Sequence, residues 1–260
     1  MNIEFIESRL INTGMLREIV FLEELDSTNK FAKRENIEND VLVLTSNQTT
    51  GKGRFERSWN SEKDNDITMS LVKSFDLNNE DIHLVTFYTS LIIIEVLKKN
   101  CRDGETKYFL KWPNDIMLNG KKVSGILIDA VDIKSKMKKL IIGIGINVNR
   151  KLFEKDLSRK ATSLALEFGR DYDLEKIISD TIENFYDNIS LLKEKKKLMD
   201  MWKSNSNIFG KEALIRVFEN SKEKRIKIID VDLDGGIKVE IENEVKIKYF
   251  SGDITVIETY

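Results

Sequence analysis

Residues 107–130 read KYFLKWPNDIMLNGKKVSGILIDA and carry the clearest fold signal in the chain. An Asn-Gly pair between two alternating apolar runs is typical of a β-hairpin, so we expect the turn at Asn119-Gly120. Regular pairing would then set Asp115 opposite Ser124. Because side chains alternate along a strand, one face should carry Lys111, Asp115, Lys122 and Ser124, and the other Trp112, Ile116 and Leu127. The polar face fits a binding site or a half-solvated surface equally well.

The next apolar run, KLIIGIGINVN at 139–149, predicts a strand with two different faces. Ile142, Ile144, Ile146 and Val148 share one face and can be buried together, whereas Gly143, Gly145, Asn147 and Asn149 share the other. Glycine weakens a strand unless a ligand or another backbone comes close. The glycine face is therefore either the floor of a pocket or a seat for a closely packed helix.

Residues 50–60, TGKGRFERSWN, form a basic loop directly after the strand-like run VLVLT. Glycine at 51 and 53 permits a tight turn and close approach to a ligand. Backbone N–H groups together with Lys52 and Arg54 would suit a phosphate or a carboxylate. The spacing does not match the P-loop of nucleotide-binding proteins. Taken alone, the segment fits a charged surface loop better than a ligand site.

The remaining patterns indicate an α/β main domain to about Ser206, followed by a small β-barrel. Strands are expected in REIVFLEEL, DVLVLTSNQTT and DITMSLVKSF, with a helix after the capping residues at 26–29. Residues 80–100 predict a buried helix, and residues 173–206 are helical in pattern. The charged stretch at 193–197 fits a solvated face. After Gly210, five short alternating runs joined by turn residues suggest the barrel.

Composition narrows the class of protein. The 260 residues include 42 Lys and Arg against 44 Asp and Glu, and this net charge of −2 argues against broad electrostatic binding of nucleic acid. The single cysteine, Cys101, excludes an internal disulfide and fits a reducing compartment. Without a secretory signal or an apolar run long enough for a bilayer, we expect a cytoplasmic protein. The lone His83 and Cys101 read as structural residues, and no Cys/His cluster suggests zinc.

Taken together, four motifs in this order resemble the biotin protein ligases. They are DSTN at 26–29, QTTGKGRFERSW at 48–59, KWPNDIMLNGKKVSGIL at 111–127 and GIGINVN at 143–149. The resemblance runs from about Val20 to the end of the chain. It implies an α+β fold: a mixed β-sheet catalytic domain flanked by helices, class II synthetase-like, at 1–206, and a small SH3-like β-barrel at 207–260.

The resemblance also implies a reaction. Family members join biotin and ATP into biotinyl-5′-AMP, releasing pyrophosphate, and then transfer biotin to one lysine of a biotin carboxyl carrier protein or domain. ATP and biotin would be the substrates, with Mg²⁺ accompanying ATP and its ligands unknown. Only about twenty-five residues precede DSTN, which is too few for the DNA-binding domain of bifunctional members. We therefore expect a monofunctional ligase with no DNA or membrane partner, and the sequence leaves a homodimer open.

Carried over position by position, the family's site residues fall into three groups. The residues implied for biotin are Ser27, Thr28, Asn29, Gln48, Lys52, Gly53, Arg54 and Lys122. Those implied for ATP or the adenylate are Gly51, Lys52, Arg54, Trp59, Lys111, Asn114 and Asn147. Lys122 and Arg54 are the expected catalytic cations, because attack of a carboxylate on a phosphate brings two anions together. Asp115 is a candidate for orienting the acceptor amine.

The loop departs from the family's commonest pattern, GRGRRGR-W, and two rival functions are weighed against biotin ligation. Lys52, Phe55 and Glu56 replace residues of that pattern, and a lysine loses the bidentate geometry of arginine. The first rival is a lipoate ligase or transferase, which shares the catalytic architecture. The second is a non-enzymatic nucleotide- or DNA-binding regulator, which the near-neutral charge disfavours.

Overall fold

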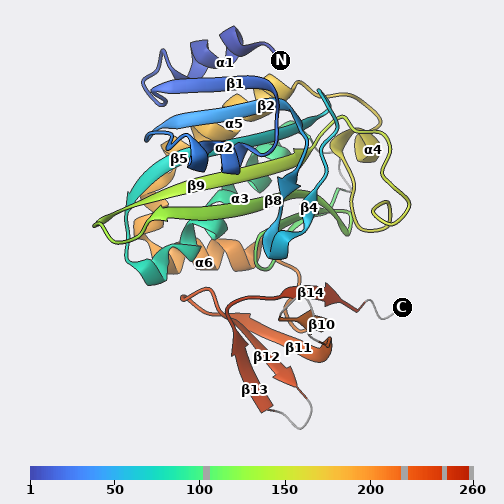
Figure 1. Ribbon diagram of the computed structural model, residues 1–260. Helices are drawn as coiled ribbons and strands as arrows, with labels where there is room; N and C mark the ends of the chain where they lie inside the picture. Colours follow the sequence, from blue (N-terminus) through green and yellow to red (C-terminus); the bar gives the residue numbers. More distant parts are fainter. Residues whose placement is uncertain (102–105, 218–221, 242–244, 258–260) are drawn as a thin grey trace.

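The computed structural model describes residues 1–101, 106–217, 222–241 and 245–257. A seven-stranded sheet in the order β1-β2-β5-β9-β8-β7-β6 forms its centre (Figure 1). Strands β1 and β2 are parallel, and the other neighbours are antiparallel. The strands are β1 Glu18–Leu25, β2 Val41–Gln48, β5 Asp66–Asp76, β6 Tyr108–Lys111, β7 Asp115–Leu118, β8 Lys121–Asp132 and β9 Met137–Asn147. This mixed sheet confirms the predicted α+β class.

Helices α3, α5 and α6 pack together behind the sheet in Figure 1 and cover the face that points away from the viewer. The helices are α1 Ile3–Leu10, α2 Thr28–Arg34, α3 His83–Asn100, α4 Leu164–Phe168, α5 Leu174–Asp187 and α6 Lys195–Ser204, with 3₁₀ turns η1 Arg54–Glu56, η2 Asn79–Asp81 and η3 Ile189–Lys193. Helix α3 lies where the sequence predicts it and is buried on most of its circumference. A helix that is apolar all round belongs in a core.

Cys101 follows α3 and is fully buried, and this burial raises the pKa of its thiol to about 12. A thiol with that pKa is protonated at neutral pH, which fits the structural role expected for it. Lys195, in the charged stretch at the start of α6, lies 2.6 Å from both carboxylate oxygens of Asp81. One lysine of that stretch therefore has a specific partner.

The C-terminal strands form a five-stranded antiparallel sheet in the order β13-β12-β11-β10-β14. They are β10 Glu212–Arg216, β11 Lys224–Val231, β12 Ile237–Ile241, β13 Val245–Tyr249 and β14 Asp253–Val256. The first four lie within the runs expected from the sequence, and β14 begins one residue before its expected run at 254–258. Within the described part of the sheet, β13 and β14 are not paired with each other, so the expected barrel is seen here as an open sheet.

The turn between β11 and β12 contacts residues that precede the C-terminal strands. The indole Nε1 of Trp112 donates to the carbonyl of Gly235 at 2.9 Å, and Nε2 of His83 lies 3.3 Å from the carbonyl oxygen of Leu233. At the expected boundary, the Ser206 hydroxyl donates to the carbonyl of Leu110 at 2.8 Å. The division into domains at 206 and 207 stays a prediction.

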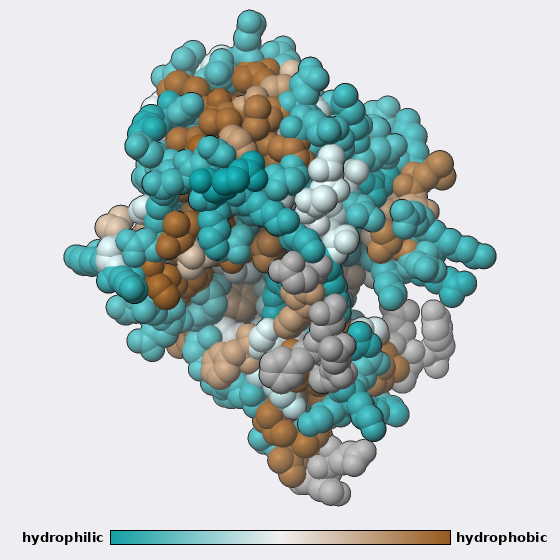
Figure 2. Space-filling model, viewed as in Figure 1, coloured by the Kyte–Doolittle hydropathy of each residue, from teal (hydrophilic) through white to brown (hydrophobic). Residues whose placement is uncertain are grey.

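The face seen in Figure 2 is covered mainly by hydrophilic side chains, with hydrophobic groups between them. In the part of the chain that the structure describes, no helix has the length and apolar character needed to cross a membrane.

Candidate functional site

Strand β9 has the two faces that the sequence predicts. Ile142 and Ile146 are fully buried in the core, whereas the glycines between them face the other way. A Cβ atom on Gly143 would come closer than 3.0 Å to the Asn29 side chain, and one on Gly145 would come equally close to the indole of Trp59. Because Asn29 belongs to α2, both readings of the glycine face hold: a helix packs on Gly143, and Gly145 lies beneath Trp59.

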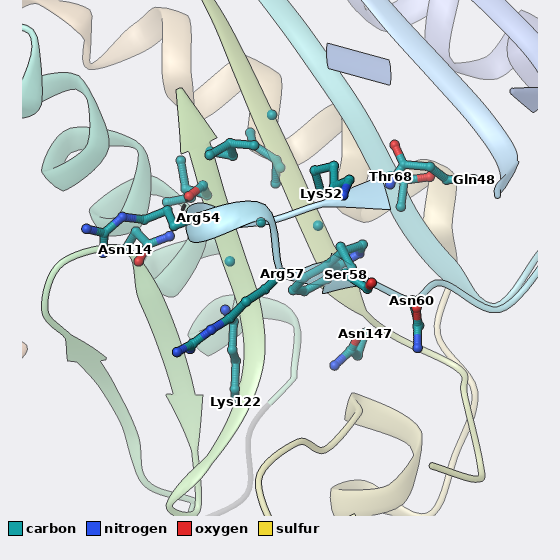
Figure 3. Close-up of a pocket in the computed structure, with 18 of the residues that line it drawn as sticks. Gln48, Lys52, Arg54, Arg57, Ser58, Asn60, Thr68, Asn114, Lys122 and Asn147 are labelled. Atoms are coloured by element: carbon teal, nitrogen blue, oxygen red, sulfur yellow. Dashed lines mark hydrogen bonds between the residues drawn. The ribbon is translucent and has the colours of Figure 1, made fainter. Parts of the chain in front are cut away.

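The basic loop is a small two-stranded ribbon. Strand β3 (Gly51–Lys52) pairs with β4 (Ser58–Trp59), and the N–H of Gly53 donates to the carbonyl of Arg57 at 2.7 Å. Within the connecting turn, Phe55 has a φ of 55°, a left-handed conformation that is uncommon outside glycine. The ribbon crosses over the glycine floor, with Arg54 and Asn114 on one side and Gln48 and Thr68 on the other (Figure 3).

The start of α2 is capped by a side chain at the end of β2, and not by the helix's own N-cap residue. Ser27 is the N-cap residue but makes no side-chain capping bond. The backbone N–H of Thr28 donates instead to Oε1 of Gln48 at 2.9 Å. Ser27 is only 4% exposed and lines the cavity. The expected side-chain cap is thus not formed at Ser27, and the helix begins at Thr28, inside the stretch expected to cap it.

Asn29 is fixed by hydrogen-bond partners on two strands, β5 and β8. Its Nδ2 donates to Oδ2 of Asp129 at 2.7 Å, and its Oδ1 lies 2.6 Å from the hydroxyl of Ser70, which is also 2.7 Å from the hydroxyl of Thr28. All of these groups except Asp129 are buried. Satisfied buried networks hold side chains in one arrangement. Ser70 and Asp129 were not anticipated from the sequence, because nothing in their local pattern links them to α2.

The hairpin forms at Asn119-Gly120 as predicted, and both turn residues have positive φ. Its register is not regular, because a bulge between 116 and 117 sets Asp115 opposite Gly125 instead of Ser124. The backbone of Lys122 bonds away from β7: its N–H donates to the carbonyl of Lys160 at 2.8 Å, and its carbonyl accepts from the N–H of Thr162 at 2.9 Å.

The bulge changes which side chains share the cavity face. Ser124 is fully buried and donates to the carbonyl of Gly145 at 2.7 Å, so its predicted place beside Lys122 is wrong. Leu127, expected on the opposite face, lines the cavity. Lys122 and Asp115 do meet, with 2.6 Å between Nζ and Oδ1. Burial alone would raise the pKa of Asp115, but Lys122, Lys111 and Arg54 outweigh it and hold that pKa below its usual range.

One cavity brings together residues from all four sequence motifs. Nζ of Lys122 lies 5.4 Å from the ring centroid of Trp59. The sequence-predicted residues that line this cavity are Ser27, Thr28, Asn29, Gln48, Lys52, Gly53, Arg54, Trp59, Asn114, Asp115, Lys122 and Asn147. Gly51 and Lys111 lie outside the lining. A Cβ on Gly51 would collide with the side chain of Gln48, so this glycine serves close packing.

Both predicted asparagines of the adenylate group have amide partners within the protein. Nδ2 of Asn114 donates to the carbonyl of Ile126 at 2.6 Å, and Nδ2 of Asn147 donates to the carbonyl of Thr162 at 3.0 Å. These bonds fix the direction of each amide group. The roles assigned to individual site residues remain predictions.

Several lining residues were not among the site residues predicted from the sequence. Arg150 is 7% exposed, pairs with the buried Asp66 at 2.7 Å and lies 5.0 Å from the ring centroid of Phe153. Burial raises the pKa of Asp66 even though Arg150 opposes that shift. Further lining residues are Arg57, Ser58, Asn60, Thr68, Leu157, Ala161 and Asp253. The last belongs to the C-terminal sheet.

The C-terminal sheet reaches the loop through its last turn. Arg54 donates from Nη1 to the carbonyl of Gly252 at 3.2 Å and from Nη2 to the hydroxyl of Ser251 at 2.9 Å. Arg57 forms an ion pair with Asp253. Burial lowers the pKa of Arg54 from its ordinary value, although the guanidinium remains protonated at neutral pH.

Comparisons with known proteins agree on one family. The model of the biotin/lipoate A/B protein ligase family matches residues 21–147. The chain is 28% identical over 256 residues to the bifunctional ligase/repressor BirA of Bacillus spizizenii, covering 92% of this chain and 74% of that protein. It is 30% identical over 129 residues to a biotin–[acetyl-CoA-carboxylase] ligase of Paracoccus denitrificans, covering 49% of this chain and 53% of that protein.

A solved structure is similar along nearly the whole chain. The biotin protein ligase from Aquifex aeolicus, in complex with biotin and ATP, superimposes with a TM-score of 0.77 at 26% identity. The match covers 94% of this chain and 100% of that one.

Proposed function

We propose that the chain is a member of the biotin/lipoate A/B protein ligase family that activates biotin with ATP and transfers it to a lysine of a biotin carboxyl carrier domain. One observation carries the proposal: four motifs that are far apart in the sequence line a single cavity, over a floor of glycines. The similar ligase from Aquifex aeolicus was solved with both biotin and ATP.

In the first step, a carboxylate oxygen of biotin bonds to the α-phosphorus of ATP, and the bond from that phosphorus to the leaving pyrophosphate breaks. Two anions approach each other, so fixed cations in the cavity lower the barrier. Lys122 and Arg54 supply positive charge there, and Asp115 holds Lys122 in place at 2.6 Å. The step uses no covalent bond to the enzyme.

In the second step, an uncharged lysine amine attacks the acyl carbon, and the bond from that carbon to the AMP oxygen breaks. The amine loses a proton in the process, and Asp115 is our candidate for orienting the amine. The depressed pKa of Asp115 keeps it ionised at neutral pH, so it would act by attracting and aligning the amine and not as a strong base.

Mg²⁺ enters the proposal as the partner of the ATP phosphates. Among the described residues, no group of three or more His, Cys, Asp or Glu side chains is arranged to hold a metal ion. The donors that could share a phosphate-bound ion therefore stay unassigned. When bound, the ion would supply further positive charge to the phosphates.

We assign the two ends of the cavity to the two substrates. Ser27, Thr28 and Gln48 would recognise the polar ring of biotin, since all three line the cavity and carry hydrogen-bonding groups. Trp59 and Asn147 would lie on the nucleotide side. The aromatic Phe153 lines the same cavity, and its planar ring suits stacking with a purine.

The test is labelling of a purified biotin carboxyl carrier domain, followed by streptavidin blotting and by measuring pyrophosphate. We expect labelling that requires both ATP and biotin, with one pyrophosphate released per biotin transferred. A parallel reaction replaces biotin by lipoate. Pyrophosphate release with lipoate but not with biotin would assign the chain to the lipoate branch of the family.

The expected absence of DNA binding stays a separate proposal, because the Bacillus relative is named as both a ligase and a repressor. A gel-shift assay with pooled random duplexes at low salt, repeated at high salt, examines it. Sequence-specific retention that survives added salt would overturn this part of the proposal. Sedimentation of the same sample with and without biotin and ATP would show whether the chain forms a homodimer.

A further inference from the structure

The C-terminal sheet supplies contacts to the loop that crosses the cavity. Residues 251–253, here called the 251–253 turn, accept two hydrogen bonds from Arg54 and form an ion pair with Arg57. Asp253 also lines the cavity itself. A segment near the end of the chain therefore touches both the loop and the space that a ligand would fill.

The 251–253 turn is firmly attached to its own sheet. Asp253 is the first residue of β14 and pairs with Arg216 of β10. The next residue, Ile254, is 2% exposed and belongs to the core. Gly252 has a φ of 154°, and a Cβ there would lie only 3.2 Å from the carbonyl oxygen of Arg216. Such a turn can act as a fixed support for whatever it contacts.

The loop, in contrast, has little to hold it in its own structure. Its ribbon contains two residues in each strand, and its turn keeps Phe55 at positive φ. A non-glycine residue in that region persists only where its surroundings impose it. Arg54 lies over the ring of Phe55, with 5.1 Å from its guanidinium carbon to the ring centroid, and the same guanidinium bonds to the 251–253 turn.

We propose that Asp253 is a positioning residue, which holds Arg57 and with it the loop over the bound intermediate. The C-terminal sheet is then a structural part of the activation site. Only the identity of the ligand in this inference rests on the proposed function. The contact between loop and turn can be tested with no ligand at all.

The first experiment measures hydrogen exchange in the ligand-free protein. Asp253→Asn removes the charge but keeps the shape, and it should speed exchange of the Gly53 amide, which bonds across the ribbon to Arg57. Because Arg57 and Asp253 are 49% and 30% exposed, we expect a rise of about three- to fivefold, typical of a partly solvated ion pair. The matched control is Glu212→Gln, which removes the Arg225 ion pair on the same sheet.

The second experiment measures how long the activated intermediate stays bound. In Asp253→Asn, biotinyl-adenylate should dissociate about three- to fivefold faster, with the KM for biotin less affected and the melting temperature equal to that of Glu212→Gln. The double variant Arg57→Asp with Asp253→Arg restores an opposite-charge pair. It should recover slow amide exchange and slow dissociation together, which a purely structural role of Asp253 would not produce.

The outcomes separate this inference from the proposed function. Unchanged Gly53 exchange in Asp253→Asn would overturn the positioning role, whatever the enzyme catalyses. Faster exchange that the charge-exchanged double variant fails to correct would likewise assign Asp253 to folding of the sheet. If wild type forms no biotinyl-adenylate, the proposed function fails, and the exchange measurements still decide the contact.

Discussion

Replacing Lys122 by methionine removes one of the two cations proposed to stabilise the transition state of biotin activation. Its Nζ is 2.6 Å from Asp115 and 5.4 Å from the centroid of the Trp59 ring, at the junction of loop and floor. Removing one group that stabilises developing charge in a transition state costs about 2.7–4 kcal/mol. The rate of pyrophosphate release from Lys122→Met should therefore fall by about 10²–10³-fold.

The same change also affects stability, and the two effects must be separated. Asp115 loses its nearest cation, but the two side chains are 31% and 18% exposed, so the full penalty of a buried unpaired charge does not apply. With Lys111 and Arg54 still nearby, we expect a loss of about 1–2 kcal/mol in the free energy of unfolding. Adding Asp115→Asn removes the unpaired charge and should recover most of that loss without recovering activity.

Pyrophosphate release is measured at saturating ATP and biotin, and unfolding is followed in urea. Lys121→Met serves as the control, because it removes the same charge from the adjacent position of the hairpin, outside the cavity lining. A folded Lys122→Met enzyme that keeps more than about a third of the wild-type rate would refute the assignment, since the loss would then be below 1 kcal/mol. Recovery of the rate in the double variant would show that only the unpaired carboxylate had been harmful.

Three further predictions follow from the same geometry. Gly145→Ala should displace the Trp59 indole, so ligand affinity should fall and the tryptophan emission should shift, with the melting temperature nearly unchanged. An unaltered ligand affinity would contradict the proposal that Gly145 forms part of the cavity floor. Arg54→Gly should weaken retention of the adenylate about ten- to a hundredfold, so that serum albumin becomes labelled on a streptavidin blot; strict carrier specificity would contradict this. The lowered pKa of Asp115 gives stability that is present above its unfolded value of about 3.9 and is lost as the pH falls through the folded-state pKa. In Asp115→Asn, the free energy of unfolding in urea should therefore fall less steeply than in wild type as the pH is lowered. An equally steep fall would exclude the effect.

Local pattern was enough to predict most helices and strands of the fold, whereas the site residues that line the cavity were predicted from the family resemblance. Alternation in β9 separated a core face from a glycine face, and Asn119-Gly120 placed the hairpin turn. Those features depend on neighbours in sequence. The register shift between 116 and 117 does not, since nothing in the local sequence marks it. As a result the sequence reading set Ser124 on the wrong face.

Contacts across elements were missed for the same reason. Gln48 caps α2 from the end of β2, and Asp129 orients Asn29 from β8, although neither position carries a recognisable capping pattern. The ion pair between Arg57 and Asp253 joins segments near opposite ends of the chain. Charged residues are frequent here, and sequence spacing alone cannot select which two of them meet.

Mutations on the two faces of β9 should affect different properties of the protein: its abundance on one face and its activity on the other. In a saturation scan read out by cellular abundance and by activity, Ile142 and Ile146 should lose abundance with polar or truncated residues, because they are fully buried in the core. Gly143 and Gly145 have no side chain to lose, so every substitution there adds atoms to an occupied space. At Gly145 the neighbour is a loop residue that can move, so abundance should survive while activity falls. Along this one strand, loss of abundance and loss of activity would therefore alternate with a period of two residues.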